Sequence, residues 1–194
     1  FAVATDSSGN VFISGYTAGN LDSNTSSGGD DLILIKYNSS GTRQWTKQYG
    51  SSGSDYARGV SLDSSGNIYV VGDTSGGLGS NSNSGSEDLF LIKYDSSGNL
   101  QWTKQLGTFT NDVAFDVATD SSGNSYVTGY TGSSLDSNTH SGELDLFLVK
   151  YDTSGNKSWS KQMGTSTSDY ARGVSIDADG NVSLTGYTLS LIHI

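Results

Sequence analysis

Residues 55–107 decide the fold, and they read DYARGVSLDSSGNIYVVGDTSGGLGSNSNSGSEDLFLIKYDSSGNLQWTKQLG. The stretch holds four short runs rich in β-branched and aromatic residues, at 57–63, 67–74, 88–95 and 100–107. Segments rich in Gly, Ser, Asn and Asp separate them, a pattern typical of short strands joined by turns and loops. No window shows an apolar period of 3.6 residues, so we expect almost no helix.

This unit recurs every 57 residues without insertion or deletion. Three columns show it most clearly: Asp6, Asp63, Asp120 and Asp177; Gly15, Gly72, Gly129 and Gly186; and Trp45, Trp102 and Trp159. A fixed period of this length predicts an array of identical supersecondary units. The repeats should fill residues 1–188, in units of approximately 1–50, 51–107 and 108–164 and an incomplete unit at 165–188.

The four runs differ in how many of their faces are apolar and must be covered by other parts of the protein. Runs 67–74 and 88–95 are apolar on both faces, so both faces need cover, whereas run 100–107 alternates, as an outer edge strand does. Gly59 and Ser61 in the first run favour close backbone approach near an axis. We therefore expect an all-β chain: a β-propeller fragment of four-stranded antiparallel blades, about three and a half of them, not closed. A parallel β-helix is the alternative, but the two hairpin turns per unit favour antiparallel pairing.

Both ends of the chain interrupt the repeat. FAVATDSSGN at 1–10 matches FDVATDSSGN at 115–124, so the chain begins inside a unit, and we expect it to be part of a longer protein. Residues 189–194, LSLIHI, leave the repeat register; this tail looks foreign, and we expect no role for it, His193 included. The apolar blade faces at the two ends would pair with missing blades or with another copy.

Composition excludes several classes of partner. The formal net charge is −10, from 20 acidic and 10 basic residues, which disfavours nucleic acid as a partner. No apolar stretch is long enough to span a bilayer as a helix, so no membrane insertion is expected. Cysteine is absent, which removes disulfides and thiolate chemistry.

The patterns GNxYVxGxT and DLFLxKYDxSGNxxWxKQxG resemble the SBBP β-propeller repeats of bacteria, over about 188 of the 194 residues. The first two runs, GVSLDSSGNIYVVGD, are also similar to those of NHL propeller repeats. The NHL similarity implies that the first strand lines a central channel. The SBBP resemblance implies a secreted or cell-surface bacterial protein, and it supplies no catalytic residues.

The DxSGN turns are the first candidate site. An acidic turn could ligate calcium, and the most suggestive copy contains Asp177, Asp179 and Asn181. The structural interpretation is stronger: Asp accepts backbone N–H groups of its own turn, and Gly supplies the left-handed residue. No other cofactor is expected.

The long polar loop between the second and third runs is the second candidate. Its oxygen-bearing side chains could form a cation or sugar site, and the residues concerned are Asp22, Asn24, Asp31, Asn81, Asp88, Asp136, Asn138 and Asp145. The alternative is a solvated loop held by its own side-chain hydrogen bonds.

Aromatic and charged residues that recur once per unit are expected to be structural. The tryptophan column should pack between blades rather than bind sugar. The lysines should either extend their charged ends to solvent or pair with the turn acids. Arg58 and Arg172 would lie at the channel mouth, where an anion or peptide contact is conceivable, although Phe115 breaks that column.

No catalytic constellation is present, because the paired acids, such as Glu87 and Asp88, recur in loops that should be exposed. The leading hypothesis is a non-catalytic extracellular propeller module that binds protein or glycan or acts as a scaffold. The alternatives are a propeller enzyme, a lyase or glycoside hydrolase, with its active site mostly outside this segment, and a calcium-stabilised scaffold.

Overall fold

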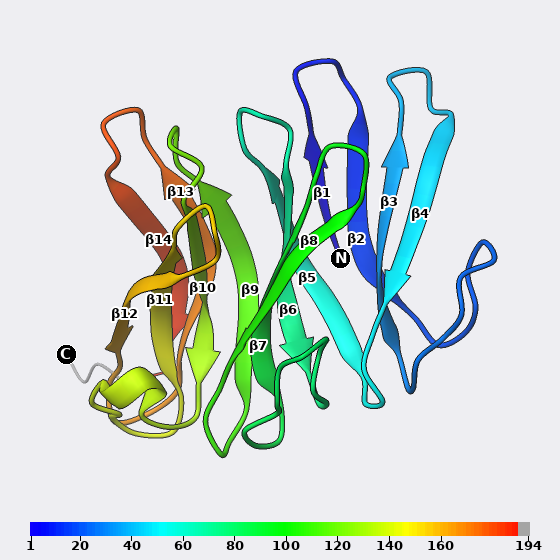
Figure 1. Cartoon of the computed structure of the whole chain (residues 1–194). Helices are drawn as coiled ribbons and strands as arrows, with labels where there is room; N and C mark the ends of the chain where they lie inside the picture. The colour runs from blue at the N-terminus through cyan, green and yellow to red at the C-terminus, as the bar shows by residue number, and fades with distance from the viewer. Residues whose placement is uncertain (190–194) are drawn as a thin grey trace.

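The computed structural model describes residues 1–189 and shows an all-β chain. Figure 1 shows the strands standing side by side in successive sheets. The first sheet holds β1 (Ala2–Thr5), β2 (Val11–Thr17), β3 (Asp31–Tyr37) and β4 (Arg43–Tyr49). The second holds β5 (Asp55–Leu62), β6 (Ile68–Thr74), β7 (Asp88–Tyr94) and β8 (Leu100–Leu106). The third holds β9 (Asp112–Thr119), β10 (Ser125–Thr131), β11 (Asp145–Tyr151) and β12 (Lys157–Met163), and a two-stranded sheet follows with β13 (Asp169–Ile176) and β14 (Val182–Thr188).

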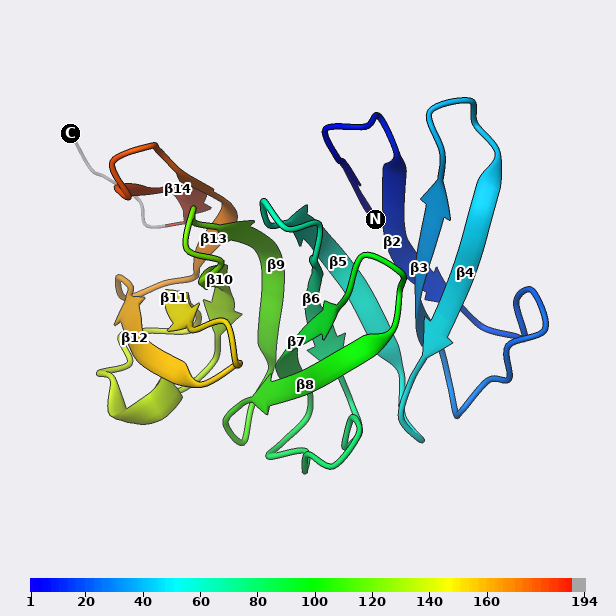
Figure 2. The same ribbon diagram turned by 45° about the horizontal axis from the view of Figure 1, so that its top comes forward.

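The sheets are the blades of an open propeller. Within each sheet, every strand pairs antiparallel with its neighbour in sequence, which excludes the parallel β-helix. The first strands of successive blades lie against one another, β1 on β5, β5 on β9 and β9 on β13, so they form the inner side, while β4, β8 and β12 form the outer edges (Figure 2). The only helix among the described residues is a 3₁₀ turn at Leu135–Ser137. The expected fold is confirmed, although β5 begins two residues before the predicted run.

Neighbouring blades bury each other's middle strands. One apolar cluster joins Phe12, Leu32 and Leu34 of the first blade to Val70 and Ile92 of the second. A second cluster joins the other face of the second blade, through Tyr69, Val71, Leu89 and Leu91, to Val127, Phe147 and Val149 of the third. Since alternate residues of one strand enter different clusters, strands apolar on both faces are required wherever a blade has two neighbours.

Inner strands approach closely where the sequence has small residues. At Gly59 an added Cβ would lie 2.9 Å from the backbone oxygen of Phe115 on the next blade. The ladder between β5 and β6 is shifted by a bulge between Ala57 and Gly59. Small residues at this level therefore set how near adjacent inner strands can lie, as the sequence predicted.

The DxSGN turns occupy one face of the propeller and the long loops the other (Figure 1). In the turn after β5, Asp63 Oδ1 accepts the amides of Ser65 and Asn67, each at 2.9 Å. Gly66 supplies the left-handed residue, at φ +78°. Six further turns repeat this geometry, with Asn38 replacing Asp in one of them.

The two ends of the blade array carry apolar residues without a neighbouring blade. Val3 and Ile13 on the first blade are 66% and 36% exposed, while their equivalents Val60 and Val70 are 8% and 0% exposed. At the other end, an open cleft of about 490 Å³ lies between the third blade and β13–β14. Leu146 and Met163 line it, and in a complete fourth blade the third and fourth strands would fill this space.

No helix among residues 1–189 is long and apolar enough to cross a membrane. Of the tail at 189–194, only Leu189 is described; its amide donates to the oxygen of Ser168 at 3.0 Å. His193 lies outside the described residues.

Candidate ligand-binding site

Three of the predicted loop ligands are not in the loops. Asp31, Asp88 and Asp145 are each 0% exposed and begin the third strand of their blade. Asp88 Oδ2 accepts the amide of Ser84 at 2.8 Å and Nε2 of Gln105 at 2.9 Å. The carboxylates of Asp31 and Asp145 have the equivalent two donors in their own blades, a serine amide of the loop and a glutamine side chain of the outer strand. The expectation that these acids are exposed was therefore wrong: each one ties its loop to the outer strand.

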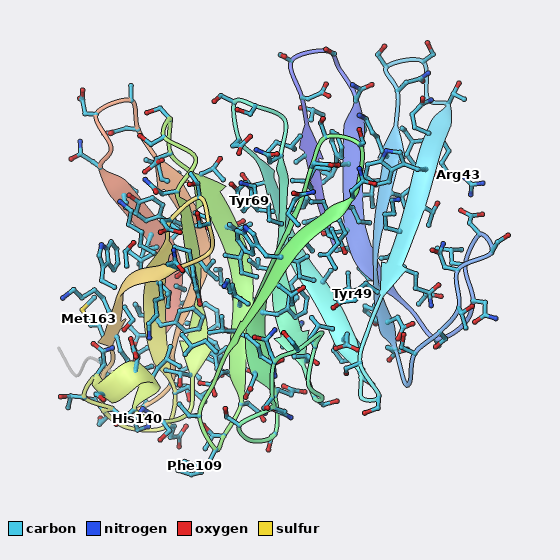
Figure 3. All side chains as sticks on the ribbon, in the orientation of Figure 1. Arg43, Tyr49, Tyr69, Phe109, His140 and Met163 are labelled. Carbon is cyan, nitrogen blue, oxygen red and sulfur yellow. The ribbon has the colours of Figure 1, made fainter. Side chains whose placement is uncertain are left out.

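The remaining loop residues also bond within their own blade. Nδ2 of Asn81 donates to the backbone oxygens of Leu78 and Thr103, and Asn24 repeats the arrangement. Nδ2 of Asn138 donates to the backbone oxygen of Leu135 and to the hydroxyl of Ser160. Asp22 pairs with Arg43, and Asp136 pairs with Lys157 (Figure 3 labels Arg43). Each loop also inserts a leucine beneath itself, and Leu78 and Leu135 are 0% exposed. This pattern matches the self-bonded loop of the structural alternative rather than a prepared ligand site.

The candidate calcium turn has the geometry of its sister turns. Asp177 Oδ1 accepts the amides of Asp179 and Asn181, and Oδ2 accepts Nδ2 of Asn181. The Asn181 side chain, its amide and that of Asp179 stabilise the carboxylate, which lowers the pKa of Asp177. These donors account for the acid without a cation. Within residues 1–189, no cluster of three or more His, Cys, Asp or Glu side chains is placed to hold a metal.

Each blade junction buries two carboxylates near each other. The carboxylate of Asp112, at the start of β9, accepts hydrogen bonds from the amide of Thr108 and the hydroxyl of Thr131. The backbone amide of Asp112 donates to the backbone oxygen of Glu87 of the preceding blade at 2.7 Å. Burial raises the pKa of Asp112, and the charge of Asp88 adds to the rise. Asp88 Oδ1 is buried and has no hydrogen-bond partner among the described residues.

We expect Asp88→Asn to leave the free energy of unfolding at pH 7 unchanged or up to about 1 kcal/mol higher. The asparagine side chain keeps an oxygen that accepts hydrogen bonds from Ser84 and Gln105. Its NH₂ group replaces Oδ1, which receives no hydrogen bond in the native protein. The substitution also removes a negative charge near Asp112. Asp88→Ala leaves both donors unsatisfied and should cost about 1–3 kcal/mol. Urea unfolding of the three proteins measures both effects.

The same variant should change the pH dependence. Because the pKa of Asp112 is raised in the folded state, the contribution of Asp112 to the free energy of unfolding falls as the pH rises from about 3.8 through that raised pKa. Asp88→Asn should lower the pKa of Asp112 and flatten this fall above about pH 3.8. An Asn variant as unstable as the Ala variant would contradict this account of the junction.

A different group of residues, absent from the loop prediction, gathers at the loop-side ends of the first and second strands of the blades. We call it the axial cluster; it consists of Tyr56, Arg58, Phe115, Tyr130, Tyr170, Arg172 and Tyr187. Arg58 and Arg172 both lie over the ring of Phe115, at 5.7 Å and 3.9 Å from its centroid. Tyr130 packs on Phe115 at 5.6 Å and on Tyr170 at 5.2 Å.

The axial cluster is where the repeat loses its symmetry. Position 73 is Asp, whereas the same position of the other units is Tyr16, Tyr130 and Tyr187. Position 87 is Glu, whereas its copies are Asp30 and Leu144. These changes give the second blade an acidic pair beside Arg58 that no other described blade has.

Arg58 is the cation of this acidic group. It forms an ion pair with Asp73, which is 0% exposed. Burial raises the pKa of Asp73, and the guanidinium opposes the rise. Burial and the charge of Asp73 raise the pKa of Glu87. The pKa of Tyr130 is raised by burial and by both acids.

Sequence reasoning identified only part of this cluster. The column of Arg58, Phe115 and Arg172 was noticed, but its contacts with Tyr130 and Tyr170 were not. A signal existed: Asp73 stands between a Gly and a Thr that are the same in all four copies of the strand, at a position where the other three copies have Tyr. Trp45 packs between blades as expected, since its Cζ2 is 3.0 Å from where a Cβ would lie at Gly98 on the next blade, whereas Trp159 is 36% exposed.

Two further sets of side chains take local roles. His140 bonds to the oxygen of Gly142 and to Gln162 beside the 3₁₀ turn (Figure 3). Lys36 and Lys93 donate to the backbone oxygens of Ser96 and Thr153 on the following blade, so these lysines bond to the turn backbone instead of forming close ion pairs with the turn acids.

Comparison with known families agrees with the geometry. The SBBP family, described as a beta-propeller repeat, matches residues 44–79, 101–136 and 158–193, which together are more than half of the chain. A crystal structure of a protein of unknown function from Bacteroides caccae superposes with a TM-score of 0.55 and 9% identity, over 93% of this chain and 50% of that one. This likeness concerns the fold alone.

Two curated proteins are similar in sequence. An uncharacterized WD repeat-containing protein of Acanthamoeba polyphaga mimivirus is 25% identical in an alignment 182 residues long, which covers 74% of this chain. The regulatory protein FlaEY of Caulobacter vibrioides is 26% identical in an alignment 139 residues long, which covers 64% of this chain. The matches span only 13% and 15% of the lengths of these relatives.

Proposed function

Because the chain belongs to the SBBP β-propeller repeat family, we propose that it is a non-catalytic binding module of a secreted or cell-surface protein, and that it binds glycan at the axial cluster. The observation that carries the proposal is the contrast between two sets of polar groups. The buried acids that begin the third strands have the same kinds of donor in all three four-stranded blades, whereas the axial cluster differs from blade to blade. Recognition of one ligand needs such a singular arrangement, on a rigid scaffold.

The chemistry of the cluster favours a sugar. Tyr56, Phe115, Tyr130 and Tyr170 are half-buried, and Tyr187 is 46% exposed. Such rings offer an apolar face for the C–H face of a sugar and, in tyrosine, a hydroxyl for its polar groups. Glu87, also half-buried, adds a hydrogen-bond acceptor. The loops that surround this end of the inner strands would restrict access to it.

Binding of immobilised glycans, with peptides printed beside them, tests the proposal. Wild-type protein should bind glycans, and Tyr170→Ala should weaken binding at least tenfold. Phe109→Ala is the matched control, because Phe109 is an aromatic residue, 76% exposed in the linker between β8 and β9, and it is not part of the axial cluster (Figure 3). Retention on peptides alone, or equal loss in both variants, would refute the proposal.

A glycosidase or lyase is the second candidate, favoured by one observation. Asp73 and Glu87 form a sheltered acidic pair that occurs once, and both have raised pKa values, as acid–base groups often do. Against it, Asp73 is fully buried and already paired with Arg58. Release of reducing or unsaturated sugar ends, lost in Glu87→Gln, would establish the enzyme instead of the binding module.

A further inference from the structure

The two arginines of the axial cluster differ in their counterions. Arg58 is paired with Asp73, and Glu87 lies near enough to raise the pKa of Arg58 further. The equivalent of Asp73 beside Arg172 is Tyr187, whose hydroxyl accepts a hydrogen bond from Nη2 of Arg172 at 2.9 Å. Over the described part of the chain, Arg172 forms no ion pair.

Arg172 is also held in place by rings. Its guanidinium lies 3.9 Å from the centroid of Phe115, 5.2 Å from that of Tyr170 and 5.4 Å from that of Tyr187. Tyr170 and Tyr187 are stacked at 4.8 Å with an interplanar angle of 29°. A guanidinium fixed in this way loses little freedom when it binds a ligand, and its remaining N–H groups can face a planar acceptor.

The neighbouring acid does not satisfy the charge. Asp116 lies next to Phe115 on β9, but its Oδ2 accepts the amide of Val174 and its Oδ1 accepts that of Val117, both at 2.9 Å. Arg172 itself is exposed to solvent. In a chain of net charge −10, an exposed guanidinium without an acid, framed by three rings, is an unusual local environment.

We propose that Arg172 and the rings of Phe115, Tyr170 and Tyr187 form a subsite for a sugar carboxylate, so that the ligand of the axial cluster is an acidic, uronate-containing glycan. This inference rests on the proposed function. The guanidinium binds the carboxylate through two N–H groups, while the stacked tyrosines hold the sugar ring. The negative protein repels a polyanion at long range, so recognition depends on this local contact.

A pair of matched probes tests the subsite: an oligogalacturonate and the same oligomer with its carboxyl groups reduced to hydroxymethyl. Calorimetry at 0.15 M salt limits long-range charge effects to about 8 Å. The acidic oligomer should bind at least tenfold more tightly than the reduced one. Arg172→Gln should remove that preference, and Arg172→Lys should keep only part of it, because ammonium lacks the planar pair of donors.

The control is Arg43→Gln, which removes an equally exposed arginine from β4 and should keep the preference. Melting curves of all variants verify that they are folded. Equal affinity for the two oligomers, or an unchanged preference in Arg172→Gln, would overturn the subsite and leave glycan binding standing. If the protein bound neither oligomer and none of the immobilised glycans, the proposed function would be refuted as well. If an acidic peptide competed equally well with the acidic oligomer, the choice of a glycan as the ligand would be overturned.

Discussion

Gly72→Ala should lower the free energy of unfolding by at least about 3 kcal/mol. A Cβ at this position would overlap the backbone oxygen of Tyr56 and approach Cζ of Phe90 to 2.9 Å. Gly72 pairs with Ala57 at the bulge between β5 and β6, so the backbone cannot retreat without breaking the ladder. Overlap with fixed backbone is among the few mechanisms that give losses of this size.

Urea unfolding measures the effect, and Gly19→Ala is the matched control. An added Cβ at Gly19 meets no atom within 4 Å, and we expect a change within about 0.5 kcal/mol. The same overlap recurs at Gly129 and Gly186, with the backbone oxygens of Val113 and Tyr170. If Gly72→Ala were as stable as the control, the register of the inner hairpin described here would be wrong.

Ile92→Ala should also have a large effect and lower the free energy of unfolding by about 2–5 kcal/mol. Ile92 is 0% exposed and lies in the cluster between the first and second blades. The repeat supplies its control, because Ile35 is the same residue at the same position of the first blade. Each isoleucine pairs within its blade with a β-branched residue and a threonine: Ile92 with Val70 and Thr103, Ile35 with Ile13 and Thr46.

The main difference between the two isoleucines is that a neighbouring blade covers Ile92 and none covers Ile35. Ile35 is half-buried on the face without a neighbouring blade, so Ile35→Ala should cost less than half as much as Ile92→Ala. Chemical denaturation of both variants under the same conditions measures the difference. Equal losses would mean that blades derive their stability from within, contrary to the packing described above.

The sequence predicted the architecture well because the repeat is regular where packing is regular. Period, hairpin turns and doubly apolar strands all follow from side chains whose neighbours recur every 57 residues. The self-bonded turns could be read from Asp and Gly alone, since both partners lie within five residues.

The buried acids and the axial cluster could not be predicted in the same way. Asp88 looks like a loop acid until Gln105 reaches it from the outer strand, 17 residues later. Tyr130 meets Tyr170 across a blade junction, at a separation that no strand period reveals. Contacts of this kind depend on how blades tilt against each other, which the alternation of a strand does not encode.

Amide hydrogen exchange tests the central claim most directly, namely that radially stacked blades bury one another's middle strands. The amides of β6 and β7 should exchange slowest, because only the second blade has four-stranded neighbours on both sides. Those of β2 and β3 should exchange faster, and those of β13 and β14 fastest. Uniform protection across the three four-stranded sheets would contradict the account, since it would mean that each sheet is stable by itself.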